Sequence, residues 1–153
     1  MDASILVIRP ALREDAPAIT AFQLAMAQET EGLELRSDTL AQGVSAVFDD
    51  PSKGTYFVAE NGGLILSSLM VTPEWSDWRN GWVWWIQSVY VLPEWRGRGV
   101  YKAMYLHIQE QVLGRTDILG IRLYVDQRNT VAGKVYARLG MNGDHYALYE
   151  WMP

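Results

Sequence analysis

Apolar residues return along the chain with two distinct periods, and these periods separate predicted helices from predicted strands. Val100, Met104, Ile108 and Val112 recur every four positions, which is the spacing of one buried helix face that Gly114 would end. Short runs of β-branched and aromatic residues, bounded by glycine, proline or asparagine, predict strands instead. On these patterns we expect strands over residues 5–9, 55–60, 64–72, 82–92, 120–125 and 147–151, and helices over residues 15–29, 37–49, 100–113 and 129–139.

The order of these elements predicts a mixed α/β domain. It reads strand, two helices, three strands, helix, strand, helix, strand, which fits neither an all-parallel sheet nor a barrel. Asn-Gly-Gly at residues 61–63 predicts a hairpin turn, and residues 73–81 are expected to form a loop. The length of 153 residues suits one domain.

Composition excludes several classes of site. With no cysteine and two histidines, a zinc site, a cysteine nucleophile and a disulfide scaffold are not expected. A formal net charge of -5 argues against broad nucleic-acid binding and favours cationic or amine ligands. We find no secretory signal and no apolar run approaching the ~20 residues that span a bilayer. We therefore expect a cytoplasmic protein that binds no metal, nucleic acid or membrane.

The strongest local feature is a strand followed by Arg96-Gly97-Arg98-Gly99 and then at once by a helix. Glycines let successive N–H groups point one way, and the helix start adds free N–H groups, so the turn suits a pyrophosphate. A Walker loop requires Gly-Lys-Ser/Thr, and a dinucleotide fingerprint requires a third glycine; neither is present. A coenzyme A pyrophosphate loop fits, and a plain strand-to-helix turn is the alternative.

A second motif follows this turn. Residues 89–99 read Val-Tyr-Val-Leu-Pro-Glu-Trp-Arg-Gly-Arg-Gly, and residues 129–141 read Asn-x-x-Ala-x-x-x-Tyr-x-x-Leu-Gly-Met. Together and in this order they resemble the GNAT superfamily of acyl-CoA-dependent N-acyltransferases. The resemblance implies one N-acetyltransferase domain over residues 1–153, with a mixed, mostly antiparallel sheet of about six to seven strands flanked by about four helices.

The resemblance also implies acetyl-CoA as cosubstrate. Backbone groups of the strand would pair with the pantetheine arm as an added strand, and N–H groups of the turn would hold the pyrophosphate. Tyr101 departs from the family pattern, which has a small residue there. The expected cofactor-binding residues are Val89, Tyr90, Val91, Arg96, Gly97, Arg98, Gly99, Val100, Tyr101, Lys102, Asn129 and Tyr136.

Three residues are expected to take part in the transfer by the same resemblance. Tyr136 would be the general acid for the leaving thiolate, since a phenol stays protonated at neutral pH. The Val91 N–H would stabilise the oxyanion from a bulge at the strand end, and Gln87 would orient a water. Asn129 would bond the pantetheine chain or cap a helix, and Tyr136 has a packing role as its alternative. No residue is assigned as general base.

The acceptor site is expected among clustered aromatic and acidic residues. All but one of the seven tryptophans lie between Trp75 and Trp95, and aromatic faces attract ammonium groups. We assign the acceptor to Trp75, Trp78, Trp84 and Glu29; the tryptophans have a sheet core or a dimer interface as alternatives, and Glu29 a solvated acidic loop.

The predicted function is transfer of an acetyl group to a primary amine of a small molecule, amino acid or peptide. The alternative is a non-catalytic acyl-CoA-binding regulatory module, and a homodimer is a further partner that the resemblance suggests.

Overall fold

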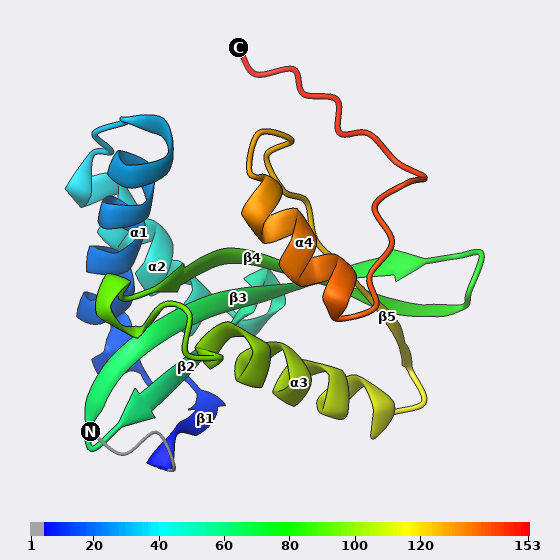
Figure 1. Cartoon of the computed structure of the whole chain (residues 1–153), viewed down its shortest axis with the longest axis horizontal. Helices are drawn as coiled ribbons and strands as arrows, with labels where there is room; N and C mark the ends of the chain where they lie inside the picture. The colour runs from blue at the N-terminus through cyan, green and yellow to red at the C-terminus, as the bar shows by residue number, and fades with distance from the viewer. Residues whose placement is uncertain (1–4) are drawn as a thin grey trace. The chain divides into compact units, whose positions relative to one another are not determined.

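The computed structural model describes residues 5–153, and the chain divides into two compact units, Met1–Arg122 and Leu123–Pro153 (Figure 1). Each unit is described by itself. The first contains the strands β1 Val7–Pro10, β2 Thr55–Asn61, β3 Leu64–Ser76, β4 Gly81–Val91 and β5 Ile118–Arg122, the helices α1 Ala16–Glu31, α2 Ser37–Asp49 and α3 Val100–Leu113, and the 3-10 turns η2 Arg13–Asp15, η3 Pro51–Lys53 and η4 Pro93–Trp95. The second contains α4 Thr130–Arg138.

The five strands form one sheet in the order β1-β2-β3-β4-β5. The first four pair antiparallel, and β5 pairs parallel with β4. The expected mixed, mostly antiparallel sheet is therefore confirmed.

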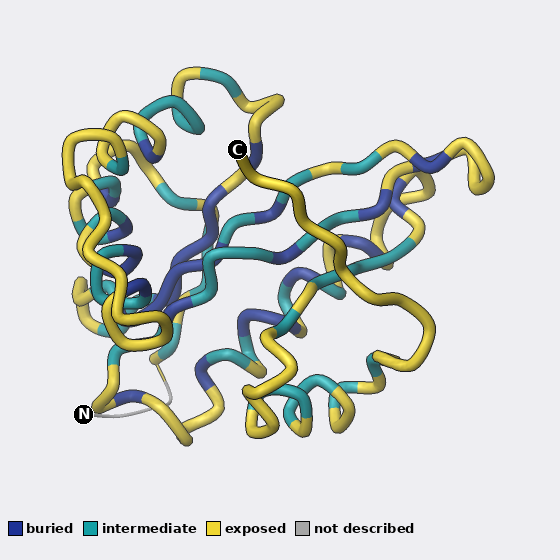
Figure 2. The backbone as a smooth tube through the Cα atoms, turned by 90° about the horizontal axis from the view of Figure 1, so that it is seen from above, coloured by how far each residue is buried: buried dark blue, intermediate teal, exposed yellow. Residues whose placement is uncertain are grey.

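The sheet has fewer strands than the six to seven expected. Residues 147–151, predicted as a strand, form none, and β5 ends at Arg122 instead of continuing to residue 125. A strand needs a neighbour for its backbone groups. Residues 142–153 are exposed throughout, as Figure 2 shows, and no ladder includes them among the described residues.

Neighbouring residues on β2 show how the two faces of the sheet are covered. Tyr56 packs in a cluster with Ile19 of α1 and Val44 of α2, whereas the Phe57 ring lies 5.9 Å from that of His107 on α3. Successive side chains of a strand point to opposite faces. Helices α1 and α2 thus cover one face and α3 the other.

The β3–β4 hairpin is longer than expected, because residues 73–76 continue β3 rather than forming a loop. Pro73 lies opposite Trp84 on β4. The last residue of β3 with a partner on β2 is Val71, so β3 has β4 as its only neighbour at Pro73. A residue without an N–H is tolerated where a strand has a neighbour on one side only. Trp75 is consequently a strand residue, and the turn is confined to residues 77–80.

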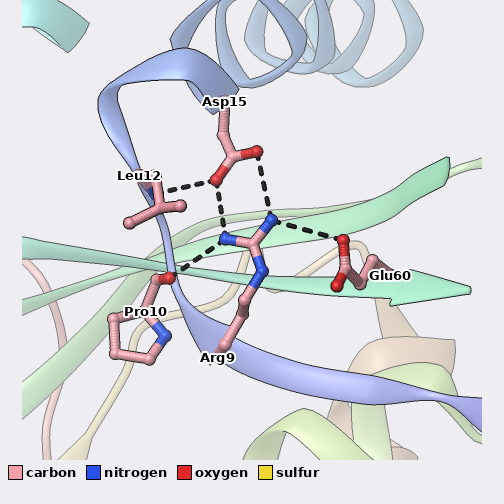
Figure 3. A network of polar contacts seen from close by, with 5 residues as sticks. All are labelled: Arg9, Pro10, Leu12, Asp15 and Glu60. Carbon is pink, nitrogen blue, oxygen red and sulfur yellow. Dashed lines mark hydrogen bonds and ion pairs between the residues drawn. The ribbon is translucent and has the colours of Figure 1, made fainter. Parts of the chain in front are cut away.

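A partly buried ion-pair network ties the first strand to the start of α1 (Figure 3). Arg9 donates to both carboxylate oxygens of Asp15, at 2.8 and 3.3 Å, and to Glu60 on β2 at 3.3 Å. Asp15 also accepts from the Leu12 N–H at 2.7 Å, and its side chain is 8% exposed. The hydrogen bond from Arg9 is the main reason that the pKa of Asp15 lies below its usual range.

Replacing Asp15 should destabilise the fold in a pH-dependent way. A carboxyl with a lowered folded-state pKa contributes stability above its unfolded pKa of about 3.9, and that contribution is lost as pH falls through the folded value. We expect Asp15→Asn to lower the free energy of unfolding at pH 7 by ~1–3 kcal/mol, with a smaller difference from the parent protein below pH ~4.

Urea unfolding at several pH values measures this difference. Asp144→Asn is the control, because Asp144 is exposed; it should leave the free energy of unfolding nearly unchanged. Equal losses in both variants, or a loss for Asp15→Asn that does not vary with pH, would contradict the assignment.

Candidate functional site

Strand β4 carries an extra residue near its C-terminal end. Ser68 lies opposite Tyr90 and Met70 opposite Gln87, so two residues of β4 occupy the space across from the single residue between them on β3. This is a β-bulge, and Ser88 within it has a φ of 57°. The bulge expected at this strand end is therefore present, located at Ser88 rather than at Val91.

A buried amide from α1 holds the bulge. Gln23 is 6% exposed, and its Nε2 donates to the Ser88 carbonyl at 3.1 Å. The carbonyl has left the regular ladder, so this donor satisfies it in the interior. Sequence reasoning missed Gln23. The available signal was a polar residue on the apolar stripe of α1, four positions after the buried Ile19.

Beyond the bulge, one edge of β4 has no strand beside it in the first unit. β5 pairs with β4 only from Trp82 to Trp85. In an antiparallel ladder, hydrogen-bonded residue pairs alternate with pairs that are not hydrogen-bonded. The Leu92 N–H donates to the Leu66 carbonyl on β3 at 2.8 Å, so this pair is a hydrogen-bonded one. The neighbouring pair, which contains Val91, is therefore not hydrogen-bonded. Its geometry points the Val91 N–H and carbonyl away from β3, toward the open edge.

The glycine turn follows directly from this edge. Gly97 and Gly99 have φ values of 74° and 79°, and no atom lies within 4 Å of the position where either would carry a Cβ. Gly99 caps α3, whose first backbone bond runs from the Ala103 N–H to the Gly99 carbonyl. The N–H groups of the first turn of α3 have no partner within the helix. The turn thus offers an uncovered cradle of N–H donors beside the positive end of a helix dipole.

The arginines of the turn bind within the protein. Arg96 donates to the Val91 carbonyl at 2.9 Å and pairs with Glu29 at 2.8 Å, while the Tyr90 hydroxyl donates to the other oxygen of Glu29 at 2.9 Å. Arg98 lies over the ring of Trp95, 5.3 Å from its centre. Sequence reasoning expected phosphate contacts for Arg96 and an acceptor contact for Glu29, and it did not anticipate their ion pair.

The contacts of Glu29 with Arg96 and Tyr90 shift the pKa values of the carboxyl and the phenol. The hydrogen bond from Arg96, followed by that from Tyr90, holds the pKa of Glu29 below its usual range. Burial, then the bond to Glu29, raises the pKa of Tyr90. Glu29 therefore stays ionised near neutral pH and anchors Arg96 against the strand end.

Two of the expected acceptor residues lie far along the hairpin from the bulge. Trp75 packs edge-on against Trp82 with ring centres 5.1 Å apart, and Trp78 at the turn is 90% exposed. At about 3.3 Å per residue, this end of β4 is roughly 20 Å from Ser88. Trp84 is closer to the bulge, opposite Pro73. The structure does not bring Trp75 or Trp78 together with Gln87 and Val91.

The remaining candidates belong to the second unit. Asn129 caps α4, and its side-chain oxygen accepts from the Ala132 N–H at 3.1 Å, which confirms the capping role. Tyr136 is half-buried on the same helix. The roles of Asn129 and Tyr136 toward a cofactor stay predictions.

Two features are absent from residues 5–153. No group of three or more histidine, aspartate or glutamate side chains there could hold a metal ion. No helix in that part of the chain is long and apolar enough to cross a bilayer.

Comparison with known families identifies the fold around this site. The model of the acetyltransferase (GNAT) family matches residues 18–141. The chain belongs to the GNAT family. The comparison with curated proteins returned no match.

Solved structures agree with this membership. A possible acetyltransferase from Clostridium difficile 630 is 39% identical over 97% of this chain and 98% of its own, with a TM-score of 0.90. A predicted acetyltransferase with acetyl-CoA from Clostridium acetobutylicum is 18% identical, with 95% and 96% covered and a TM-score of 0.74. AAC(6')-Iy, in complex with the bisubstrate analogue CoA-S-monomethyl-acetylneamine, is 16% identical, with 97% and 98% covered and a TM-score of 0.77.

Removing the amide of Gln23 should destabilise the GNAT fold through the bulge. Gln23→Leu leaves the Ser88 carbonyl without its donor, and we expect a loss of ~1–3 kcal/mol in the free energy of unfolding. Gln42→Leu, at an exposed position of α2, is the matched control and should change little. Chemical denaturation measures both, and an equal effect in the two variants would show that the bond to Ser88 is unimportant.

Proposed function

We propose that the protein transfers an acetyl group from acetyl-CoA to a primary amine of a small molecule, amino acid or peptide. The observation that carries this proposal is the continuous run from the open edge of β4, through the glycine turn, to the start of α3. Open strand backbone suits an extended amide-containing chain, and clustered N–H donors suit a pyrophosphate. Acetyl-CoA contains both, with its acetyl group as a thioester at the far end.

The residues of this run fit the cofactor. Backbone groups of Val89 and the Val91 N–H would pair with the pantetheine arm, because Arg96 already holds the Val91 carbonyl. The N–H groups from Arg98 to Lys102 would hold the pyrophosphate. The left-handed φ of Gly97 and Gly99 supports this fit, because residues with a side chain rarely adopt the backbone conformation that shapes the cradle. Arg96 holds the strand end in place by donating to the Val91 carbonyl and to Glu29, so it is not a free phosphate ligand.

The transfer requires a hydrogen-bond donor for the oxyanion. It also requires two proton transfers, one from the amine nitrogen and one to the thiolate sulfur. The amine nitrogen bonds to the acetyl carbon, the carbon–sulfur bond breaks, the amine loses a proton and the thiolate gains one. The Val91 N–H is the proposed oxyanion donor, and Tyr136 the proposed acid for the thiolate. Gln87 would orient a water that takes the amine proton. Glu29 is a weak base, since its pKa is lowered.

A side chain at position 99 should weaken acetyl-CoA binding. Gly99 has a φ that costs other residues ~1–2 kcal/mol, and relief of that strain would turn the N–H groups of the cradle. We expect Gly99→Val to raise the Kd for acetyl-CoA about tenfold or more, measured by calorimetry. Gly114→Ala at the other end of α3, where φ is -80°, should leave the Kd unchanged. Equal Kd values in Gly99→Val and the parent protein would refute the cradle.

Removing the hydroxyl of Tyr136 should slow turnover and spare binding. Loss of a general acid typically costs ~10²–10⁴-fold in rate, so we expect Tyr136→Phe to lower kcat by at least about 10²-fold with an unchanged Kd for acetyl-CoA. Thiol release gives kcat and calorimetry gives Kd. Tyr149→Phe is the control, because Tyr149 is 94% exposed. An unchanged kcat would exclude Tyr136 as the acid.

The regulatory alternative has its own outcome in these assays. A non-catalytic module would bind acetyl-CoA through the same cradle and release no thiol with any amine.

A further inference from the structure

A cavity lies between α1, α2 and the sheet, on the same side as the bulge. Its volume is about 470 Å³, within the range of small-molecule sites, and Ser88 and Gln23 both line it. It belongs wholly to the first unit. The residue that distorts β4 therefore also forms part of the wall of a cavity.

The wall of this cavity is mostly apolar. Met26, Leu40, Val47 and Met70 line it together with Tyr56, whose pKa is raised by burial so that its hydroxyl stays neutral. Apolar walls favour an apolar group, at roughly 25 cal/mol per Å² of surface removed from water.

Charged groups in the cavity are scarce. Glu31 is the single carboxylate among the lining residues, and it is exposed at the C-terminal end of α1. The Gln23 amide is already engaged with the Ser88 carbonyl, and the Thr30 hydroxyl donates to the Met26 carbonyl at 2.8 Å. One carboxylate can pair with one ammonium group and leaves further charges on a ligand without partners.

Gly43 supplies an independent observation. It lies in the middle of α2, where glycine is less favourable than alanine, and it lines the cavity. A Cβ built at Gly43 would have no atom within 4 Å. Neither its helical conformation nor a close contact requires glycine here. Gly43 is itself exposed, so a side chain at this position would stand at the open rim of the cavity.

We propose that this cavity holds the body of the acceptor, and that the acceptor is a monoamine carrying an apolar aliphatic or aromatic group. The proposal rests on the proposed acetyl transfer. The apolar group lies between α1 and α2, and the amine is directed to the bulge at Ser88, next to the strand end that carries Val91. A polyamine fits poorly, because its additional charges would face Met26, Leu40 and Val47.

A panel of amines tests the substrate class. With saturating acetyl-CoA, thiol release is measured for 2-phenylethylamine and hexylamine against ethanolamine and spermidine. We expect kcat/KM for the first two to exceed that for the last two by about tenfold or more, the discrimination that an apolar pocket achieves. Preference for ethanolamine or spermidine would overturn the proposal.

Variants at Gly43 test the place of binding. Gly43→Leu adds a side chain at the exposed rim of the cavity and should raise KM for 2-phenylethylamine about tenfold, with the Kd for acetyl-CoA unchanged. Ala41→Leu adds the same side chain to an exposed position of α2 and should change neither constant. Circular dichroism checks that both variants fold. An unchanged KM in a folded Gly43→Leu protein would overturn the placement.

Calorimetry with 2-phenylethylamine alone separates this inference from the proposed function. Binding that Gly43→Leu abolishes, without thiol release from any amine, supports the cavity and contradicts acetyl transfer. Thiol release with polar amines, without binding of 2-phenylethylamine, supports acetyl transfer and overturns the cavity proposal.

Discussion

The hydrogen bond from Gln23 to the Ser88 carbonyl holds the distortion on which the geometry of the site depends. An extra residue in β4 takes Ser88 to a positive φ and removes its carbonyl from the ladder. The donor from α1 gives that carbonyl the hydrogen bond that the regular ladder would otherwise supply. The bond therefore couples the packing of α1 to the shape of the strand end.

Helix α1 contacts the site at two further points. Phe22 stacks on Tyr90 with ring centres 5.2 Å apart, and Glu29 joins Tyr90 to Arg96. One helix thus positions the bulge, the strand end and the first residue of the glycine turn. It also supplies one wall of the cavity between α1 and α2. A change in the position of α1 would therefore affect the proposed acceptor and cofactor regions together.

Local patterns were sufficient to predict the helices and the glycine turn, because their signals lie within a few residues of one another. The contact of Gln23 with Ser88 and that of Glu29 with Arg96 join positions 65 and 67 residues apart, and only the fold brings them together. The predicted strand at residues 147–151 failed for a related reason: alternation of residue types indicates a strand, but a partner must be present to form one.

The central claim is that the edge of β4, the glycine turn and the start of α3 form one binding surface for acetyl-CoA. Titration of the ¹⁵N-labelled protein with acetyl-CoA, followed by backbone amide chemical shifts, tests it most directly. The account predicts saturable shifts concentrated at residues 89–91 and 97–102, with little change at the hairpin turn over residues 77–80. Saturable shifts confined to other parts of the chain, or none at millimolar acetyl-CoA, would contradict it.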